Sequence, residues 1–396
     1  MPRFPRTTPT ADGLSDRIFG EMAARARRHS GKIHALQVGD TYLDPPAMMR
    51  AESLRSADHV RLHNYAAVQG EPVLLDAIVE HLRARGGVEV DRELVQVTNG
   101  GTGGLSAIAQ TLLDPGDEVL LPSPFWPLAR GIIASRGAVP VQVPLFTRLD
   151  QIGLGETALD VETLLEGAVT ERTTAIYVNT PNNPTGRVLS SPVLAAIGRV
   201  AARHALWILC DEAYEELWLG DDAPAPAWAR DDFRARSVAV HTLSKGYGFA
   251  GARIGFVHGP AEAMRVLRSV NTFHTYCAPR PFQIGAARAM REAGTWLDEA
   301  RALYREAGAR AADALRVARP EGGTFLFVDV SAYLRDGEDS CVAFLDRALD
   351  AGVWLTPGTA CGRDFPRHVR LCFTAVPPAE LDEALLALVP LLRSAS

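Results

Sequence analysis

The sequence has few cysteines, little lysine and no strong excess of one charge. The five cysteines among its 396 residues are scattered and form no C-x-x-C pair. This favours reduced structural thiols over disulfides or zinc, and we predict no metal site. The 41 basic and 47 acidic residues give a net charge of −6, without long runs of one sign. This balance argues against nucleic acid or an anionic membrane surface as the main partner.

Long apolar segments are also missing. No uninterrupted apolar run approaches the roughly 20 residues that a membrane-spanning helix needs. The N-terminus MPRFPRTTPTADGLSDR has no apolar core of signal-peptide length. We therefore expect no membrane association and a cytoplasmic location. The chain is nevertheless 47% hydrophobic, which is enough for a large buried core, and its length predicts about two or three domains.

Short apolar runs alternate with helical patterns through much of the chain. The runs are rich in Val, Ile and Leu, and they are too short for long helices. They predict strands buried on both faces of a mostly parallel sheet. Helical stretches such as SPVLAAIGRVAARHA fit between them, as an α/β core requires. The runs are EVLLPSP, TAIYVNTPNNPTG, HALWILCDEAYEE, SVAVHTLSK and ARIGFVHG.

The last third of the chain has a different pattern. PFQIGAARAMREAGTWLDEARALYREAGARAADALRVA predicts a long helix that carries the chain into a second domain. That domain would hold GGTFLFVDVS, VWLTPG and HVRLCFTA as strands and a final helix in PAELDEALLALVPLLRS. We predict an N-terminal arm with part of the small domain in residues 1–45, a large domain in 46–290 and a C-terminal small domain in 291–396.

Polar side chains follow two of the predicted strands. Asp211 ends the run ALWILCD, and Asn183 follows AIYVNT. In parallel α/β sheets, ligands bind outside the carboxyl ends of strands, so both residues are placed to face a small molecule. Tyr214, three residues beyond Asp211, can reach the same ligand. The alternative is that Asp211 caps a helix in AYEELW and that NNPTG is only a turn.

Lys245 lies in HTLSKGYGFAGARIG, also directly after a short apolar run. A lysine amine is a nucleophile only when it is deprotonated, and burial or nearby cations lower its pKa toward that state. Arginine, which carries most of the positive charge of this chain, cannot lose its proton in this way. The alternative is a surface lysine in a flexible glycine-rich loop.

A third candidate is the stretch TNGGTGGLSAIAQTLL, where glycines lead into a predicted helix. Backbone amides at a helix N-terminus bind anions, so Gly101 and Thr102 are candidate phosphate ligands. Arg253, Thr242 and Ser244 can add a charge and hydroxyls to the same group. A flexible loop without a ligand is the alternative.

Together these elements resemble the fold type I enzymes that use pyridoxal phosphate (PLP), and within them the class I and II aminotransferases. The resemblance runs from about residue 36 to about residue 375. The intervals from Asn183 to Asp211, Asp211 to Lys245 and Lys245 to Arg253 are 28, 34 and 8 residues, as is typical of this family. Its ordered landmarks are LQVGDTYLDPP, YAAVQGEPVLLDAI, VTNGGTGGL, LDPGDEVLLPSPFW, NTPNNPTG, CDEAYEE, SKGYGFAGARIG, LTPG and VRLCFTA.

The resemblance implies catalytic roles for Lys245, Asp211 and Tyr214. Lys245 would hold the cofactor as an internal aldimine and then move the proton between the substrate α-carbon and the cofactor C4′. Asp211 would keep the pyridine nitrogen protonated, so that the ring withdraws electrons. Asn183 and Tyr214 would hydrogen-bond to the phenolic oxygen, and Trp126 would stack on the ring.

The resemblance also implies the binding groups and the assembly. Arg370 would pair with the substrate carboxylate, with Gly39 and Asn183 in the same substrate site. A homodimer with active sites at the interface is expected, because Tyr65 would reach the phosphate of the partner subunit. The phosphate ligands would be Gly101, Thr102, Thr242, Arg253 and Tyr65.

Some features depart from the family pattern or have an ordinary alternative. Trp126 and Arg370 are each compatible with a plain core or surface role. The loop GGTGG leaves Thr102 as its only hydroxyl, and Cys361 stands where many relatives have phenylalanine after the LTPG turn. His274, Tyr276 and Arg280 are unusual enough to indicate a particular substrate side chain.

The implied function is transfer of an amino group from an L-amino acid to a 2-oxo acid. One alternative is a lyase or cyclase that performs β or γ elimination or replacement with the same cofactor residues, because the surrounding site selects the reaction. The other is a regulator that only senses a ligand. About 35 residues precede LQVGD, which is too few for the DNA-binding domain that such regulators carry.

Overall fold

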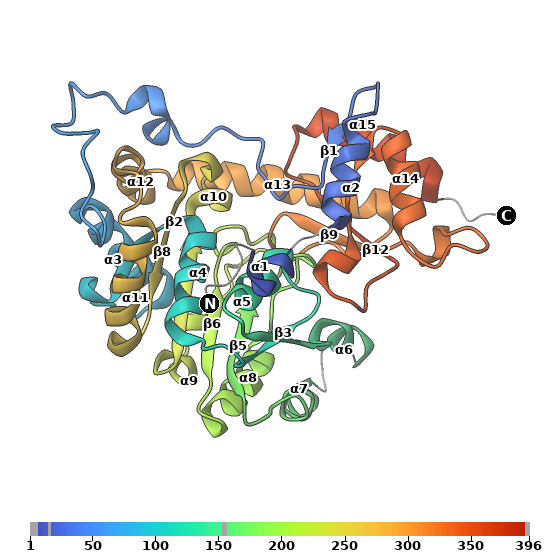
Figure 1. Cartoon of the computed structure of the whole chain (residues 1–396). Helices are drawn as coiled ribbons and strands as arrows, with labels where there is room; N and C mark the ends of the chain where they lie inside the picture. Colours follow the sequence, from blue (N-terminus) through green and yellow to red (C-terminus); the bar gives the residue numbers. More distant parts are fainter. Residues whose placement is uncertain (1–6, 15–16, 153–156, 393–396) are drawn as a thin grey trace, which may run out of the picture.

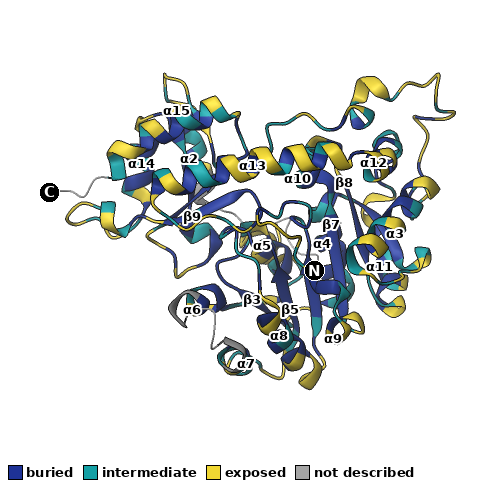
Figure 2. Ribbon diagram, turned by 180° about the vertical axis from the view of Figure 1, so that it is seen from behind, coloured by how far each residue is buried: buried dark blue, intermediate teal, exposed yellow. Residues whose placement is uncertain are grey.

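The computed structural model of the chain describes residues 7–14, 17–152 and 157–392 and has an α/β fold (Figure 1). Figure 2 shows that the strands are buried, whereas the exposed residues lie mainly on the outer sides of helices. No helix within these ranges combines the length and apolar character needed to cross a membrane.

The main sheet has seven strands in the order β2-β8-β7-β6-β5-β3-β4. β8 is antiparallel to both of its neighbours, and the other pairs are parallel. The predicted fold class is therefore confirmed. The sequence pattern did not indicate β2 or β4, because VQVTN and VPVQV mix polar with apolar residues. The strands are β2 (Val95–Asn99), β3 (Glu118–Pro122), β4 (Val139–Val143), β5 (Thr173–Asn179), β6 (Trp207–Asp211), β7 (Ser237–Thr242) and β8 (Ile254–His258).

Helices cover both faces of this sheet. Successive strand residues point to opposite faces, and Leu120 accordingly joins one apolar cluster, whereas Val119 and Leu121 join another. The first cluster includes α3 (Pro72–Gly86), α6 (Leu145–Ile152), α7 (Thr157–Glu166), α8 (Ser191–Arg203) and α12 (Arg280–Glu292). The second includes α4 (Gly100–Leu112), α5 (Pro127–Ser135) and α11 (Ala261–Thr275).

A separate apolar cluster holds the C-terminal part together with residues near the N-terminus. Its small sheet has the order β11-β12-β9, and β1 pairs with β10. The predicted strands in this part are present, whereas the predicted domain limits stay a prediction. The elements are α2 (Arg17–Ala26), β1 (His34–Ala35), α13 (Gly294–Leu315), β9 (Phe325–Asp329), α14 (Val342–Asp350), β10 (Val353–Trp354), β11 (Thr356–Pro357), β12 (His368–Cys372) and α15 (Pro378–Leu388).

The long helix predicted from PFQ to RVA is two helices. Ala293 ends α12 and precedes α13, with φ −93° and ψ 21° outside the helical range. Gly294, which follows, has poor helix propensity, and this allows the chain to change direction there. The short elements are α1 (Pro9–Asp12), α9 (Asp231–Arg234), α10 (Leu243–Gly246) and 3₁₀ turns at Ala47–Met49, Ala51–Ser53, Arg92–Leu94, Ala227–Ala229, Ala250–Ala252, Ser331–Tyr333, Gly358–Cys361 and Val389–Leu392.

Candidate active site

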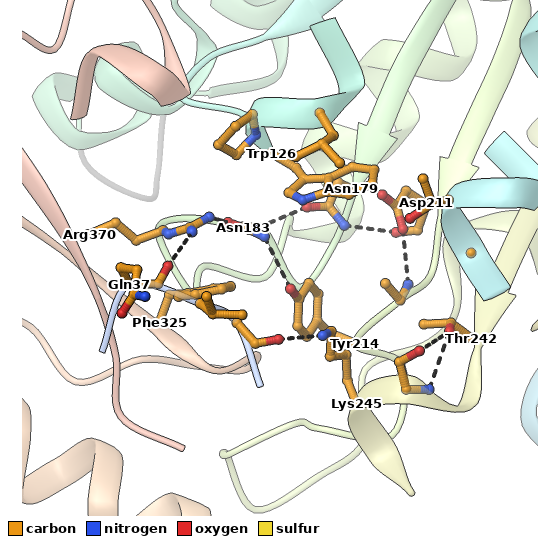
Figure 3. Close-up of a pocket in the computed structure, with 18 of the residues that line it drawn as sticks. Gln37, Trp126, Asn179, Asn183, Asp211, Tyr214, Thr242, Lys245, Phe325 and Arg370 are labelled. Carbon is orange, nitrogen blue, oxygen red and sulfur yellow. Dashed lines mark hydrogen bonds between the residues drawn. The ribbon is translucent and has the colours of Figure 1, made fainter. Parts of the chain in front are cut away.

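A cavity of about 400 Å³ lies at the carboxyl ends of β5, β6 and β7 (Figure 3). Its volume falls in the range of roughly 300–1,000 Å³ that small-molecule sites occupy. Residues from distant parts of the chain meet there because parallel strands end at one edge of the sheet. Of the predicted site residues, those lining the cavity are Gly39, Gly101, Thr102, Trp126, Asn183, Asp211, Tyr214, Thr242, Ser244, Lys245, Arg253 and Arg370.

Lys245 is half-buried at this cavity, in the short helix α10 that follows β7. Thr242 starts the helix, and its Oγ1 accepts the backbone N–H of Ser244 at 3.2 Å. The Nζ of Lys245 donates to the carbonyl of Gly39. Burial lowers the pKa of Lys245, and the positive charges of Arg253 and Arg370 act in the same direction, whereas the negative charge of Asp40 opposes this shift without cancelling it. These are the conditions under which a lysine amine becomes a nucleophile or a base near neutral pH.

Asp211 ends β6 and is buried. Its Oδ2 accepts the hydroxyl of Tyr177 at 2.5 Å, and its Oδ1 accepts the backbone N–H of Ala213 at 3.1 Å. Burial raises the pKa of Asp211, whereas these two hydrogen bonds lower it. Residues 213–216 form turns, so Asp211 does not cap a helix as the alternative interpretation required.

Three polar side chains form a hydrogen-bonded chain across the cavity wall. Arg370 donates to Asn183 Oδ1 at 3.0 Å, and Asn183 Nδ2 donates to the hydroxyl of Tyr214 at 3.1 Å. The Arg370 guanidinium also lies 4.2 Å from the ring centroid of Phe325 and donates to the carbonyl of Gln37 at 3.0 Å. Arg370 is therefore a buried, oriented cation and not a solvated surface charge.

The glycine-rich stretch begins α4 and faces Arg253. Gly100 has a φ of +71°, and a Cβ added there would lie 2.5 Å from Nη2 of Arg253. Only glycine therefore leaves the guanidinium in this position. Gly101 and Thr102 lie in the first turn of α4, whose N–H groups have no partner within the helix and suit an anion.

The remaining predicted residues lie elsewhere. Tyr65 is 82% exposed and contacts Tyr276 edge to face, with ring centroids 5.1 Å apart. Both line a second cavity of about 750 Å³, together with Arg280, which forms an ion pair with Glu71 at 3.0 Å. His274 is exposed, and Cys361 is fully buried. In the described part of the chain, neither cavity brings all the predicted residues together.

Several residues that line or support the first cavity were not predicted from the sequence, and four of them carry polar or aromatic groups. Gln37, Asn179 and Phe325 line it, and Tyr177 lies behind Asp211. Asn179 donates to the backbone carbonyl of Asp211 at 2.9 Å, and its Oδ1 accepts the N–H of Asn183. The position of Asn179 at a strand end was a usable signal. The sequence gives no comparable signal for Gln37 and Phe325, because they come from segments outside the main sheet.

The donor set suits PLP. It offers an amine with a lowered pKa for the aldehyde, a buried carboxylate for the ring nitrogen, and a helix N-terminus beside an arginine for the phosphate. The absence of a side chain at Gly100 leaves the room that the Arg253 guanidinium occupies beside this helix end. An α/β fold with this site defines the class of fold type I PLP-dependent enzymes.

The comparisons with known proteins give the family. The model of the class I and II aminotransferases matches residues 32–388. The chain is 33% identical to an arginine–pyruvate transaminase of Pseudomonas aeruginosa, with 90% of this chain and 92% of that protein covered. It is 31% identical to an aspartate/prephenate aminotransferase of Thermus thermophilus, with 89% of each covered. The chain belongs to the class I and II aminotransferase family.

Solved structures agree with this assignment. A mutant aspartate aminotransferase of Thermus thermophilus has a TM-score of 0.87 at 28% identity and covers 98% of this chain and 100% of its own. An N-succinyldiaminopimelate aminotransferase from Mycobacterium tuberculosis has the same TM-score at 30% identity, with the same coverage. The predicted family, fold, cofactor and PLP-dependent amino-group transfer are confirmed, and the lyase or cyclase alternative is not favoured. The roles of individual residues stay predictions.

Replacing Glu212 with glutamine is expected to flatten the pH dependence of stability. Burial raises the pKa of Glu212 from 4.5 to about 8, and the charge of Glu215 adds to this. In the folded state Glu212 therefore keeps a proton that it loses in the unfolded state. The free energy of unfolding is highest below pH 4.5 and falls as the pH rises toward 8. The loss is about 1.4 kcal/mol per pH unit within that window.

Urea unfolding without PLP, at one protein concentration and at pH 6 and 8, measures this effect. The wild type should lose more stability between the two pH values than Glu212→Gln does. The acceptor for the N–H of Ala227, 3.2 Å from Oε1 of Glu212, remains in the variant. Glu299→Gln, at an exposed position, is the control and should follow the wild type. Equal slopes for the wild type and Glu212→Gln would contradict the prediction.

Proposed function

We propose that the cavity formed at the ends of β5, β6 and β7 transfers an amino group from an L-amino acid to a 2-oxo acid, with Lys245 as the proton carrier. The observation that carries this proposal is the enclosure of the Lys245 amine in one cavity with Asp211, Arg253 and Arg370. Bound PLP supplies the electron sink that makes the substrate α-proton acidic. The protein residues then position the reactants and move the proton.

Lys245 and Asp211 divide the catalytic work. With PLP bound, the Nζ of Lys245 would be the group that holds and moves the proton taken from the substrate α-carbon. Its lowered pKa favours the neutral amine that this step requires. Asp211 accepts a hydrogen bond from the protonated ring nitrogen and holds that proton in place. The hydroxyl of Tyr214, fixed by Asn183, faces the cavity and donates to the phenolic oxygen.

The remaining cavity residues bind and orient. Arg370 takes the substrate carboxylate as a bidentate pair, and its bond to Asn183 fixes its direction. Trp126 would hold the ring of PLP by stacking. Gly39 keeps the substrate site open, since a Cβ at Gly39 would lie 2.3 Å from the phenyl ring of Phe325. Gly101, Thr102, Thr242 and Arg253 bind the phosphate.

The direct test is a set of half-reactions. The PLP-loaded protein is mixed with single amino acids, the oxo acid is identified, and the absorbance of the cofactor is followed. Stoichiometric conversion of an amino acid to its oxo acid, with the amino group retained on the cofactor, supports transfer. Release of ammonia without that retention would overturn it.

The proposal includes a homodimer. Tyr65, with 82% of its surface exposed, contacts the ring of Tyr276, which is 47% exposed. An exposed pair of large aromatic side chains favours a protein contact. A second copy of the chain is the partner that gives Tyr65 a phosphate to bind. A cytoplasmic location stays a prediction of the sequence.

Tyr65→Phe is expected to weaken PLP binding about tenfold, because one hydrogen bond to a charged group is lost. Mixing Tyr65→Phe with Lys245→Ala chains tests whether Tyr65 serves the partner site. About half of the dimers are then hybrids, and one of the two sites in each hybrid has both Lys245 and Tyr65. Binding and activity should therefore return in about a quarter of all sites. The mixture is assayed at a PLP concentration that leaves Tyr65→Phe largely unloaded. Tyr333→Phe, away from both cavities, is the control. Normal sedimentation as a dimer without any recovery would contradict the exchange of Tyr65 between subunits.

A further inference from the structure

Tyr177 is a buried tyrosine whose hydroxyl contacts the side chain of Asp211. It lies on β5, two residues before the strand ends at Asn179, and Asn179 is paired in register with Asp211 on β6. Only 2% of its surface is exposed, and its hydroxyl donates to Asp211 Oδ2 at 2.5 Å. Tyr177 therefore bonds to the carboxylate without lining the cavity.

The two oxygens of Asp211 are held by different parts of the chain. Oδ1 accepts the backbone N–H of Ala213 at 3.1 Å, and Oδ2 accepts the hydroxyl of Tyr177. The terminal torsion of an aspartate side chain is broad, so one hydrogen bond alone leaves the carboxylate plane free to turn. The second bond, from Tyr177, restricts that rotation. It also favours the ionised carboxylate, because a donor bonds more strongly to an anion.

Packing alone does not account for a tyrosine at this position. Its ring belongs to the apolar cluster that α4, α5 and α11 form with the sheet. Burying a hydroxyl without a partner costs about 1–3 kcal/mol, and phenylalanine would fill the same space without this cost. The hydroxyl is tolerated because Asp211 accepts it. Burial raises the pKa of Tyr177 well above its ordinary value, so the hydroxyl keeps its proton and remains a donor.

We propose that Tyr177 is a positioning residue that aims the Asp211 carboxylate at the ring nitrogen of PLP. This inference rests on the role proposed for Asp211. The tyrosine touches neither substrate nor cofactor and acts through the aspartate. Its hydroxyl thereby sets how tightly the ring is bound and how well the protonated nitrogen is held.

The test is Tyr177→Phe, which removes one oxygen from the core. The dissociation constant of PLP is expected to rise about tenfold, the loss of one hydrogen bond to a charged group. The absorbance bands of the bound cofactor should change. In the loaded enzyme, kcat should fall while the KM for the amino acid stays near its wild-type value, because Arg370 is untouched. Tyr304→Phe is the control, at a fully buried tyrosine in the apolar cluster of the C-terminal part. It should leave the PLP affinity and the spectrum unchanged.

A double-mutant cycle separates positioning from packing. In an Asp211→Asn background, Tyr177→Phe should have little further effect on PLP affinity, because the carboxylate it orients is gone. Equal losses with and without Asp211 would overturn the inference, as would an unchanged PLP affinity and spectrum in Tyr177→Phe. If Asp211→Asn itself left PLP affinity and spectrum unchanged, the proposed role of Asp211 would fail first.

Discussion

Lys245→Arg is expected to lower kcat for amino-group transfer by about 10⁴-fold, because the group that carries the proton is lost. Arginine keeps the positive charge but cannot be deprotonated in a protein, so it can neither attack the aldehyde nor accept the α-proton. A single-turnover measurement of oxo acid formation checks this. Borohydride reduction of the wild type should attach the cofactor to the peptide that contains Lys245.

Lys32 provides a matched control for this prediction, because it is the other lysine of the sequence. It is exposed and forms an ion pair with Glu383 at 2.6 Å. Lys32→Arg keeps that pair and should show wild-type rates and normal labelling at Lys245. Cofactor found on Lys32, or a Lys245→Arg variant with normal turnover, would overturn the assignment.

Asp211→Asn is expected to reduce kcat by roughly 10²–10³-fold, comparable to the loss of a preorganised electrostatic group in other enzymes. The amide is nearly the same size but carries no negative charge, so it cannot stabilise a protonated ring nitrogen. The substrate carboxylate still binds to Arg370, so the KM should change less than kcat. Steady-state kinetics at saturating PLP measure both constants.

The control for Asp211→Asn is Asp336→Asn, at an exposed position outside both cavities. It removes one negative charge from the molecule and should leave both constants unchanged. The prediction fails if Asp211→Asn retains wild-type kcat when fully loaded with PLP. It also fails if only KM changes, since that pattern would indicate a role in substrate binding.

The order of chemical groups along the chain predicted much of the site. Asp211 and Lys245 each follow a run of buried strand residues, and this local pattern places them at the edge of a parallel sheet. Strand 95–99 was missed because Gln96 and Thr98 make it look polar. Both side chains are fully buried, and Gln96 donates to backbone carbonyls. The hydroxyl of Thr98 donates to the nearby carbonyl of Gly100, whereas Gln96 also donates to Val68, from a segment that the local pattern does not show.

The sequence by itself determined the α/β class, the family and the types of reactive group, because these depend on short patterns and on their order. The tertiary structure decided which groups touch. Arg370 meets Asn183 although 187 residues separate them, and Tyr177 meets Asp211 across 34. The contact of Arg370 with Asn183 depends on how the C-terminal strands pack against the main sheet. The contact of Tyr177 with Asp211 depends on the register of β5 against β6. A shift of one residue would turn Tyr177 to the opposite face of the sheet.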